Sequence, residues 1–227
     1  MTLILGIDDA GRGPVIGPMI LAGVLINKEQ EKIIKKSGVT DSKLLWHDQR
    51  MKLSKIIKEN SINSKVIKVY PSEIDAALNS KNNNLNKLEA QKMADVVNNL
   101  NKGKERIQVI IDCPSVNITV WKRTLLKFLS KTSNLTIKCE HKADFNHTTV
   151  AAASILAKVV REDEIAKIRK QYSKYGNIGS GYPSDPLTKE FLKKNGETLA
   201  NSGIFTKTWS TWKKMFPDKQ QKTLGEF

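Results

Sequence analysis

The chain has 227 residues, of which 38 are Lys or Arg and 23 are Asp or Glu, so its net charge is +15. This length allows one domain with a small appendage, and the charge indicates a polyanionic partner, with nucleic acid ahead of a membrane surface. The longest apolar stretch, Met19 to Ile26, is too short to span a bilayer, and Cys113 and Cys139 lack the spacing of a disulfide or zinc framework. These features disfavour secretion and membrane insertion and rule out a structural zinc site, and we expect a cytoplasmic protein.

The first part of the chain contains three candidate strands. Leu3 to Asp8 and Met19 to Ile26 are short apolar segments bounded by Gly and Pro, and they predict two strands joined by a glycine-rich loop. Residues 48–59 follow a helical stripe, and Lys65 to Tyr70 alternates as a third strand would. Asn79 to Lys87 is rich in Asn and predicts a loop.

Strand and helix patterns alternate in the rest of the chain. They predict a helix from about 85 to 100, a strand from Ile107 to Asp112, a helix from about 116 to 130, a strand from Leu135 to Glu140 and a helix from about His147 to Tyr172. This alternation predicts an α/β fold with a substantially parallel sheet. Gly176 to Pro186 is a loop that leads into a smaller helical part, and the last residues carry no core pattern.

Four acidic residues lie at or just past the carboxyl ends of predicted strands, where open α/β sheets place their active sites. Asp8 and Asp9 close the first strand, Asp112 closes the fourth, and Asp144 follows the fifth. Converging carboxylates repel one another, and bound divalent metal is the usual compensation. Oxygen ligands without Cys or convergent His favour Mg²⁺ or Mn²⁺, and two such ions about 4 Å apart can drive phosphodiester hydrolysis. The alternative for any one acid is a capping or turn role, which four acids in this arrangement disfavour.

The loop between the first two strands, GRGPVIG from Gly11 to Gly17, has some likeness to a dinucleotide-binding motif. Its spacing is G-x-G-x-x-x-G, Pro14 interrupts it, and it leads into a strand instead of a helix, so we discard that interpretation. What remains is a flexible loop beside the first two acids. Its backbone can approach a ligand closely, and Arg12 supplies a guanidinium.

Five motifs in order along the chain make the sequence resemble a known family. They are GIDDAGRGPVIGPM, DSKLL from Asp41, IDCPSVN from Ile111, HKADFNHTTVAAASILAKVVRED from His141 and GSGYPSDP from Gly179. They closely resemble ribonuclease HII, particularly its archaeal branch, from residue 3 to about residue 212. The resemblance implies an α/β, ribonuclease H-like fold: a mixed five-stranded sheet flanked by helices, with a small helical C-terminal extension. It also implies an endoribonuclease that hydrolyses the RNA strand of RNA·DNA hybrids and cuts at ribonucleotides embedded in duplex DNA, leaving 5′-phosphate and 3′-hydroxyl ends.

The resemblance assigns catalytic and metal-binding roles to the same four acids that the strand ends indicate. The family's ligands fall on Asp8, Asp9, Asp112 and Asp144, which would hold two Mg²⁺ or Mn²⁺ ions. At position 9 the family usually has Glu. The shorter Asp9 withdraws its carboxylate by about 1.5 Å, one C–C bond, so we expect altered metal geometry or rate, but not loss of the ligand.

The resemblance also assigns substrate-binding residues. The loop that meets the ribonucleotide's 2′-hydroxyl, the feature that separates RNA from DNA, falls on Gly11, Arg12 and Gly13. The tyrosine that stacks on the following deoxyribose falls on Tyr182. Further candidates near the substrate phosphates are Ser42, Lys43, Ser154, Lys158 and Arg161. The last three share one polar helix face, for which a solvated surface is the alternative.

We expect a ribonuclease H-like catalytic core over residues 1–175, a helical subdomain over 176–216 and a tail over 217–227. In the tail, Gln221, Leu224 and Phe227 resemble the peptide with which replication proteins bind the sliding clamp PCNA, and a plain disordered tail is the alternative. The expected partners are RNA·DNA hybrid, ribonucleotide-containing duplex DNA and this clamp. We expect a monomer that does not bind membranes.

Two other functions compete with the enzyme. The basic charge alone would support a nucleic-acid-binding protein on the same fold, inactivated by the change at Asp9. Such a relative would be expected to lose a carboxylate outright, and none of the four is lost. A nuclease specific for DNA is the second rival, and the loop from Gly11 to Gly13 together with Tyr182 argues against it.

Overall fold

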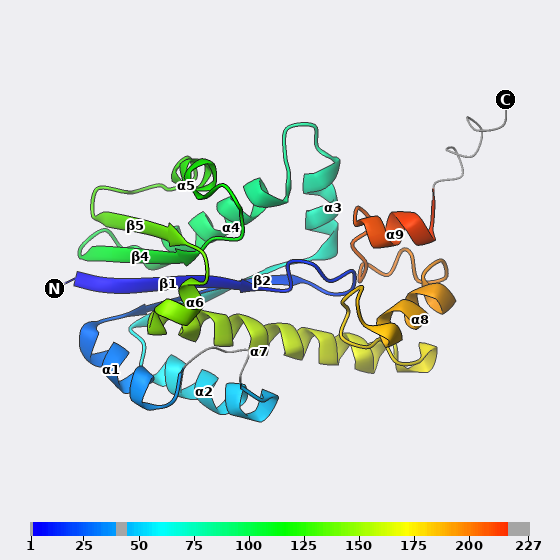
Figure 1. Cartoon of the computed structure of the whole chain (residues 1–227), viewed down its shortest axis with the longest axis horizontal. Helices are drawn as coiled ribbons and strands as arrows, with labels where there is room; N and C mark the ends of the chain where they lie inside the picture. The colour runs from blue at the N-terminus through cyan, green and yellow to red at the C-terminus, as the bar shows by residue number, and fades with distance from the viewer. Residues whose placement is uncertain (1, 40–44, 218–227) are drawn as a thin grey trace.

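A computed structural model describes residues 2–39 and 45–217, which form a five-stranded sheet with helices on both faces (Figure 1). The strands are β1 (Thr2–Ala10), β2 (Met19–Ile26), β3 (Asn63–Val69), β4 (Arg106–Asp112) and β5 (Leu135–Glu140), in the order β3-β2-β1-β4-β5. The pairs β1–β2 and β2–β3 are antiparallel, whereas β4 runs parallel to both β1 and β5. The expected mixed α/β sheet is confirmed.

The helices form one layer on each face of the sheet (Figure 1). One layer contains α3 (Pro71–Asn79), α4 (Leu85–Leu100) and α5 (Ile118–Leu126); the other contains α1 (Lys28–Lys36), α2 (His47–Glu59) and α7 (Thr148–Gln171), which follows the short α6 (Ala143–Asn146). Strand side chains alternate between the faces. Leu5 and Ile7 therefore pack in the core beneath α4, while Ile4 and Ala10 pack beneath α7.

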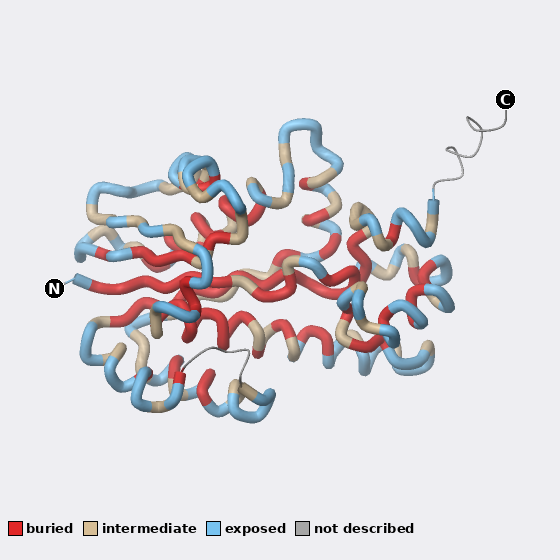
Figure 2. Tube along the Cα trace, viewed as in Figure 1, coloured by how far each residue is buried: buried red, intermediate tan, exposed pale blue. Residues whose placement is uncertain are grey.

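The long helix α7 packs very close to β1. Its first turns are rich in buried alanine, and Figure 2 shows the burial continuing along the helix and the central strands. A Cβ on Gly6 of β1 would lie 2.4 Å from the carbonyl carbon of Thr149, so a larger residue would force the helix away. The start of α7 is therefore fixed against the strand that carries the first two acids.

The C-terminal part folds against the end of α7 around an apolar cluster of its own. It contains the 3₁₀ turn η2 (Ser173–Tyr175) and the helices α8 (Pro186–Asn195) and α9 (Ser210–Met215). Val15 and Ile16, from the loop after β1, belong to this cluster, and their backbone N–H groups donate to Gly181 O at 2.9 and 3.2 Å. The glycine-rich loop is thus held between the sheet and the C-terminal part. The domain boundaries at 175 and 216 stay predictions.

The sequence does not predict α1, α3 or α6. α1 begins with a capping box in which Asn27 and Gln30 exchange hydrogen bonds of 2.8 and 2.9 Å. α3 begins at Pro71, so the proline that follows β3 also starts a helix. The helix expected from 116 to 130 is shorter, Ile118–Leu126. Within residues 2–39 and 45–217, no helix is long and apolar enough to cross a membrane.

Candidate active site

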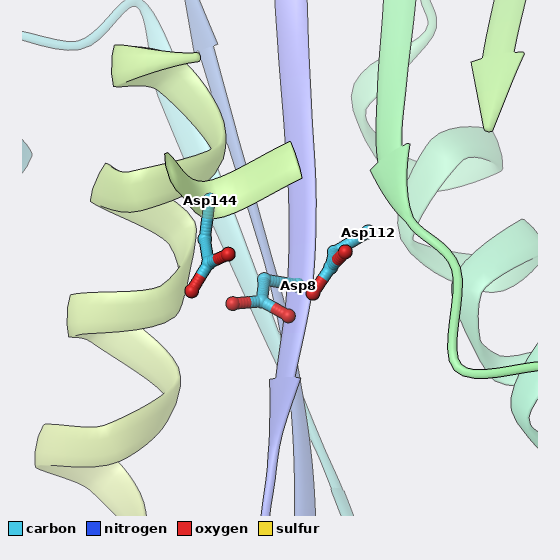
Figure 3. A group of neighbouring side chains, drawn as sticks. All are labelled: Asp8, Asp112 and Asp144. Carbon is cyan, nitrogen blue, oxygen red and sulfur yellow. The ribbon is translucent and has the colours of Figure 1, made fainter. Parts of the chain in front are cut away.

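Three of the four predicted acids form a cluster at the carboxyl ends of β1 and β4. Asp8 comes from β1, Asp112 from β4 and Asp144 from α6, and one oxygen of each lies within 4.8 Å of the others. Figure 3 shows the three carboxylates pointing toward one another from these separate elements. Asp8 is 5% and Asp144 is 6% exposed, so both carboxylates are almost removed from water.

Strand register and one hydrogen bond explain this convergence. β1 and β4 are parallel neighbours with Ile7 opposite Ile111, so the next residue of each strand, Asp8 or Asp112, points to the α7 side of the sheet. The backbone N–H of Ala143 donates to Asp112 Oδ1 at 3.0 Å. This bond fixes the start of α6, and the acid that follows, against β4.

The electrostatics of the cluster favour a bound cation. Burial raises the pKa of Asp8 well above its ordinary value, and the charges of Asp9 and Asp112 raise it further. Hydrogen bonds from Ser154 and from the Asp9 backbone N–H, the latter at 2.7 Å, act in the opposite direction. A divalent ion would compensate the clustered charge, and carboxylates are the hard oxygen ligands that Mg²⁺ and Mn²⁺ prefer. The residues present therefore fit a metal of this class.

Asp9 is not a member of this group of three, because consecutive strand residues point to opposite faces of a sheet. It is nevertheless close enough for its charge to raise the pKa of Asp8. Ile7 packs in the core beneath α4, so Asp9 leaves β1 on that side, whereas Asp8 leaves it on the α7 side. Burial raises the pKa of Asp9 to about 7, the nearby charge of Glu89 adds to the rise, and Arg12 opposes it. The role of Asp9 as a metal ligand stays a prediction.

A cleft of about 440 Å³ opens at Asp9, the residue that follows Asp8. It is lined by Asp9, Ala10, Gly11, Arg12, Gly13, Arg50, Lys158, Arg161, Glu162 and Tyr182. Six predicted substrate-binding residues are thus brought together from the loop after β1, from α7 and from the C-terminal part. Gly11 has a φ of +84°, and a Cβ there would lie 2.6 Å from the side chain of Arg161, so glycine is needed at this position.

The side chain of Arg12 turns from this loop toward α4. Its Nε–H donates to Glu89 Oε1 and its Nη2–H donates to Asn86 Oδ1, both at 2.8 Å. Glu89 is 0% exposed, and burial raises its pKa while Arg12 lowers it. The sequence analysis missed Glu89 and Asn86. The sequence did contain one signal for Glu89: this acid follows Leu88, which lies on the apolar face of the predicted helix.

Two predicted substrate-binding residues of α7 have partners inside the protein. Ser154 is 1% exposed and hydrogen-bonds to Asp8. Arg161 is buried; its guanidinium carbon lies 4.6 Å from the centre of the Tyr182 ring, and its Nη2–H donates to Ser180 O at 3.0 Å. Arg161 therefore supports one side of the ring, while Tyr182 itself is exposed. Substrate contact by Ser154, Arg161 and Tyr182 stays a prediction.

α2 contributes Arg50 to the same cleft, a residue that the sequence analysis also missed. Its guanidinium pairs with Glu162 of α7 and donates from Nη1 to Leu45 O at 2.5 Å. The expected phosphate-binding residues just before this point, Ser42 and Lys43, lie outside the described residues, as do the expected clamp-binding residues Gln221, Leu224 and Phe227.

The chain matches a known family over almost all of its length. Residues 5–212 match the family model described as Ribonuclease HII. A ribonuclease HII of Methanococcus maripaludis (strain C6) is 39% identical over 227 residues, which cover 99% of this chain and 92% of the relative. The crystal structure of the ribonuclease H2 from Pyrococcus horikoshii OT3 aligns with a TM-score of 0.79 and 36% identity, covering 94% of this chain and 96% of that chain. The RNase HII in the PCNA:RNase HII complex from Archaeoglobus fulgidus aligns with a TM-score of 0.78 and 35% identity, covering 91% and 95%.

Proposed function

Because this chain belongs to the ribonuclease HII family, and is therefore a metal-dependent type 2 ribonuclease H acting on RNA·DNA hybrids, we propose that it also cuts at single ribonucleotides embedded in duplex DNA. It does so by two-metal-ion catalysis and leaves 5′-phosphate and 3′-hydroxyl ends. The observation that carries the proposal is the convergence of Asp8, Asp112 and Asp144 at the end of β1, where the next residue, Asp9, lines the cleft that contains the glycine-rich loop.

The carboxylates of this cluster would hold the divalent ions, two Mg²⁺ or Mn²⁺, with Asp9 as a further ligand. The chemistry that such ions would supply there is activation of a water molecule and stabilisation of the leaving oxygen of the scissile phosphate. The chain's own contribution is a rigid arrangement of ligand oxygens. The bond from the Ala143 N–H fixes Asp112, and the bond from Ser154 fixes Asp8, so the geometry is in place before substrate arrives.

The loop from Gly11 to Gly13 and the ring of Tyr182 would select the cut site. The loop's backbone groups hydrogen-bond to the 2′-hydroxyl, which DNA lacks. Tyr182 stacks on the next deoxyribose, and Arg161 supports the ring from behind. The two contacts together recognise an RNA-to-DNA junction, and their common support is the backbone bonding of Val15 and Ile16 to Gly181.

The strong positive charge supports a groove that binds the duplex through its phosphates. A net charge of +15 favours binding by counterion release. Lys158, half-buried in the cleft, lies close enough to Asp9 to influence its pKa, which places a cation beside the acids. The enzyme would act as a cytoplasmic monomer. Ser42 and Lys43, outside the described residues, would contact the substrate phosphates.

We further propose that Gln221, Leu224 and Phe227 bind a PCNA sliding clamp. The complex of the Archaeoglobus fulgidus RNase HII with PCNA supports this partner. The test is to titrate the cognate clamp with the full chain and with a version that lacks residues 220–227. Binding that is lost on truncation supports the contact, whereas equal binding by both versions rejects it and leaves hybrid cleavage unaffected.

Cleavage of three matched duplexes tests the main proposal. The three duplexes share one complementary DNA strand. The other strand is all DNA in the first duplex, DNA with one ribonucleotide in the second, and all RNA in the third. We expect the protein to cut the second and third duplexes only when Mg²⁺ or Mn²⁺ is present, with 5′-phosphate and 3′-hydroxyl ends at the cut. Cleavage of the all-RNA strand without cleavage at a single ribonucleotide would reject the finer proposal.

A further inference from the structure

An ion pair joins α4 to the loop after β1 across 77 residues of sequence. Arg12 donates through Nε to Glu89 Oε1 and through Nη2 to Asn86 Oδ1, so one edge of its guanidinium is held by two acceptors. Arg12 is 39% exposed, whereas Glu89 is 0% exposed. The pair therefore runs from the open cleft into the interior of the protein.

Glu89 is a costly residue to place where it lies. A buried carboxylate loses its hydration, and an apolar residue of similar volume often serves folding as well or better. Neighbouring buried positions of α4, such as Met93 and Val97, are apolar. Glu89 Oε2 is buried without a hydrogen-bond partner in the described part of the chain, so the hydrogen bonding of this carboxylate rests on Oε1 and its bond to Arg12.

The loop depends on Arg12 for a side-chain anchor at its tip. Gly11 and Gly13 flank Arg12 and have no side chains, and a Cβ on Gly13 would meet nothing within 4 Å. On the far side of the tip, Pro14 O accepts from the Trp209 Nε1–H at 2.9 Å, and the backbone N–H of Val15 is bound to Gly181 O. The bonds from α4 to Arg12 therefore fix the part of the loop that lies between β1 and Pro14.

We propose that Glu89, assisted by Asn86, is a positioning residue for ribonucleotide recognition. It holds Arg12 on α4 and thereby sets the backbone of Gly11 and Gly13 at the place where the 2′-hydroxyl is read. This inference rests on the proposed function of that loop. It also assigns the guanidinium of Arg12 to anchoring the loop, while the backbone makes the contact with the substrate.

Binding without cleavage gives the most direct test. In EDTA, the Kd is measured for an all-DNA duplex and for the same duplex with one ribonucleotide. The Kd for the all-DNA duplex divided by the Kd for the ribonucleotide duplex is the recognition ratio, which is larger when the 2′-hydroxyl is recognised. Glu89→Leu keeps the packing volume but removes the acceptor, and we expect the ratio to fall several-fold while the all-DNA Kd and the melting temperature change little. Glu89→Gln keeps a neutral acceptor and should give an intermediate ratio. Asn86→Ala, at an exposed position, should shift the ratio the same way by a smaller amount.

A matched control and a double variant distinguish positioning from general stability. Glu73→Gln breaks the 2.7 Å pair of Glu73 with Lys92, another ion pair on α4, and should leave the ratio unchanged. Combining Glu89→Leu with Arg12→Leu should lower the ratio no further than Arg12→Leu alone, because Glu89 acts through Arg12.

Several results would overturn the proposal. They are an unchanged ratio in Asn86→Ala, an unchanged ratio in a folded Glu89→Leu protein, equal losses on both duplexes, and additive losses in the double variant. If the buried substitution prevents folding, Asn86→Ala alone decides the question. Failure of the proposed loop function looks different, since the unmodified protein would then bind the two duplexes equally.

Discussion

Replacing Asp9 with Asn should stabilise the metal-free protein at alkaline pH far more than in acid. The pKa of Asp9 in the folded protein is about 7, against 3.8 for an unperturbed Asp, because of burial first and the charge of Glu89 second. Between these two values the folded protein holds a proton that the unfolded chain has released. Stability therefore falls as the pH rises from about 4 to 7 and then becomes constant.

The size of this effect follows from the shift. One pKa unit corresponds to about 1.4 kcal/mol. A rise from 3.8 to about 7 removes about 2 kcal/mol of folding stability at pH 5 and about 4 kcal/mol at pH 8. Asp9→Asn cannot ionise and avoids this loss. Its stability relative to the unmodified protein should therefore improve by about 2–3 kcal/mol between pH 5 and pH 8.

Urea unfolding in EDTA at pH 5 and pH 8 measures this difference. Glu190→Gln serves as the control, because Lys194 lowers the pKa of Glu190 below its ordinary 4.5 and leaves that carboxyl ionised over the whole range. The stability difference between this control and the unmodified protein should be the same at both pH values. A difference for Asp9→Asn that also stays constant would refute the buried, charge-crowded environment inferred for Asp9.

Other predictions concern the substrate and the metal. Asp9→Glu should give an active enzyme with an altered rate or metal preference, measured as cleavage in Mg²⁺ and in Mn²⁺; unaffected cleavage by Asp9→Ala would show that this residue is not a ligand. Tyr182→Ala should reduce cleavage and blunt the preference for RNA-to-DNA junctions more than it weakens overall binding, whereas equal losses on every substrate would make Tyr182 a structural residue. Affinity for a hybrid should fall about 10³-fold between 50 and 200 mM salt if six phosphates are neutralised, and a flat titration would contradict the basic groove.

The convergence of Asp8, Asp112 and Asp144 could be predicted from the sequence, because it follows from short-range rules. Each acid ends or follows a strand, and the carboxyl ends of neighbouring parallel strands meet at one edge. The structure confirms this parallel arrangement of β1, β4 and β5. Residue types and spacing were therefore enough to predict that these three acids form a cluster.

To predict where Asp9 lies relative to this cluster, the alternation of side chains along β1 must be considered for Asp8 and for Asp9 in turn. Asp8 and Asp9 are neighbours in sequence, yet they leave the strand on opposite faces. Glu89 could not be assigned for a different reason. Its partner Arg12 is 77 residues away, and the pairing depends on how the first turns of α4 dock beside the loop.

The polar face of α7 shows a similar limit of sequence analysis. The spacing of Ser154, Lys158 and Arg161 places them on one side of the helix, but it does not reveal what covers that side. The structure buries Ser154 beside Asp8 and packs Arg161 against Tyr182. Helix periodicity gives the direction of a side chain, whereas its partner depends on tertiary packing.

The central claim is that the acid cluster holds the metal that cuts the substrate, and Asp112→Asn tests it most directly. Asn keeps an Oδ1 acceptor for the Ala143 N–H, which donates at 3.0 Å, so the position of α6 should be preserved while a charged ligand is lost. The measurement compares cleavage and binding of a duplex with one ribonucleotide, in Mg²⁺ and in Mn²⁺. We predict that Asp112→Asn abolishes cleavage and retains binding. Cleavage at a nearly normal rate by this variant would contradict the assignment of the site.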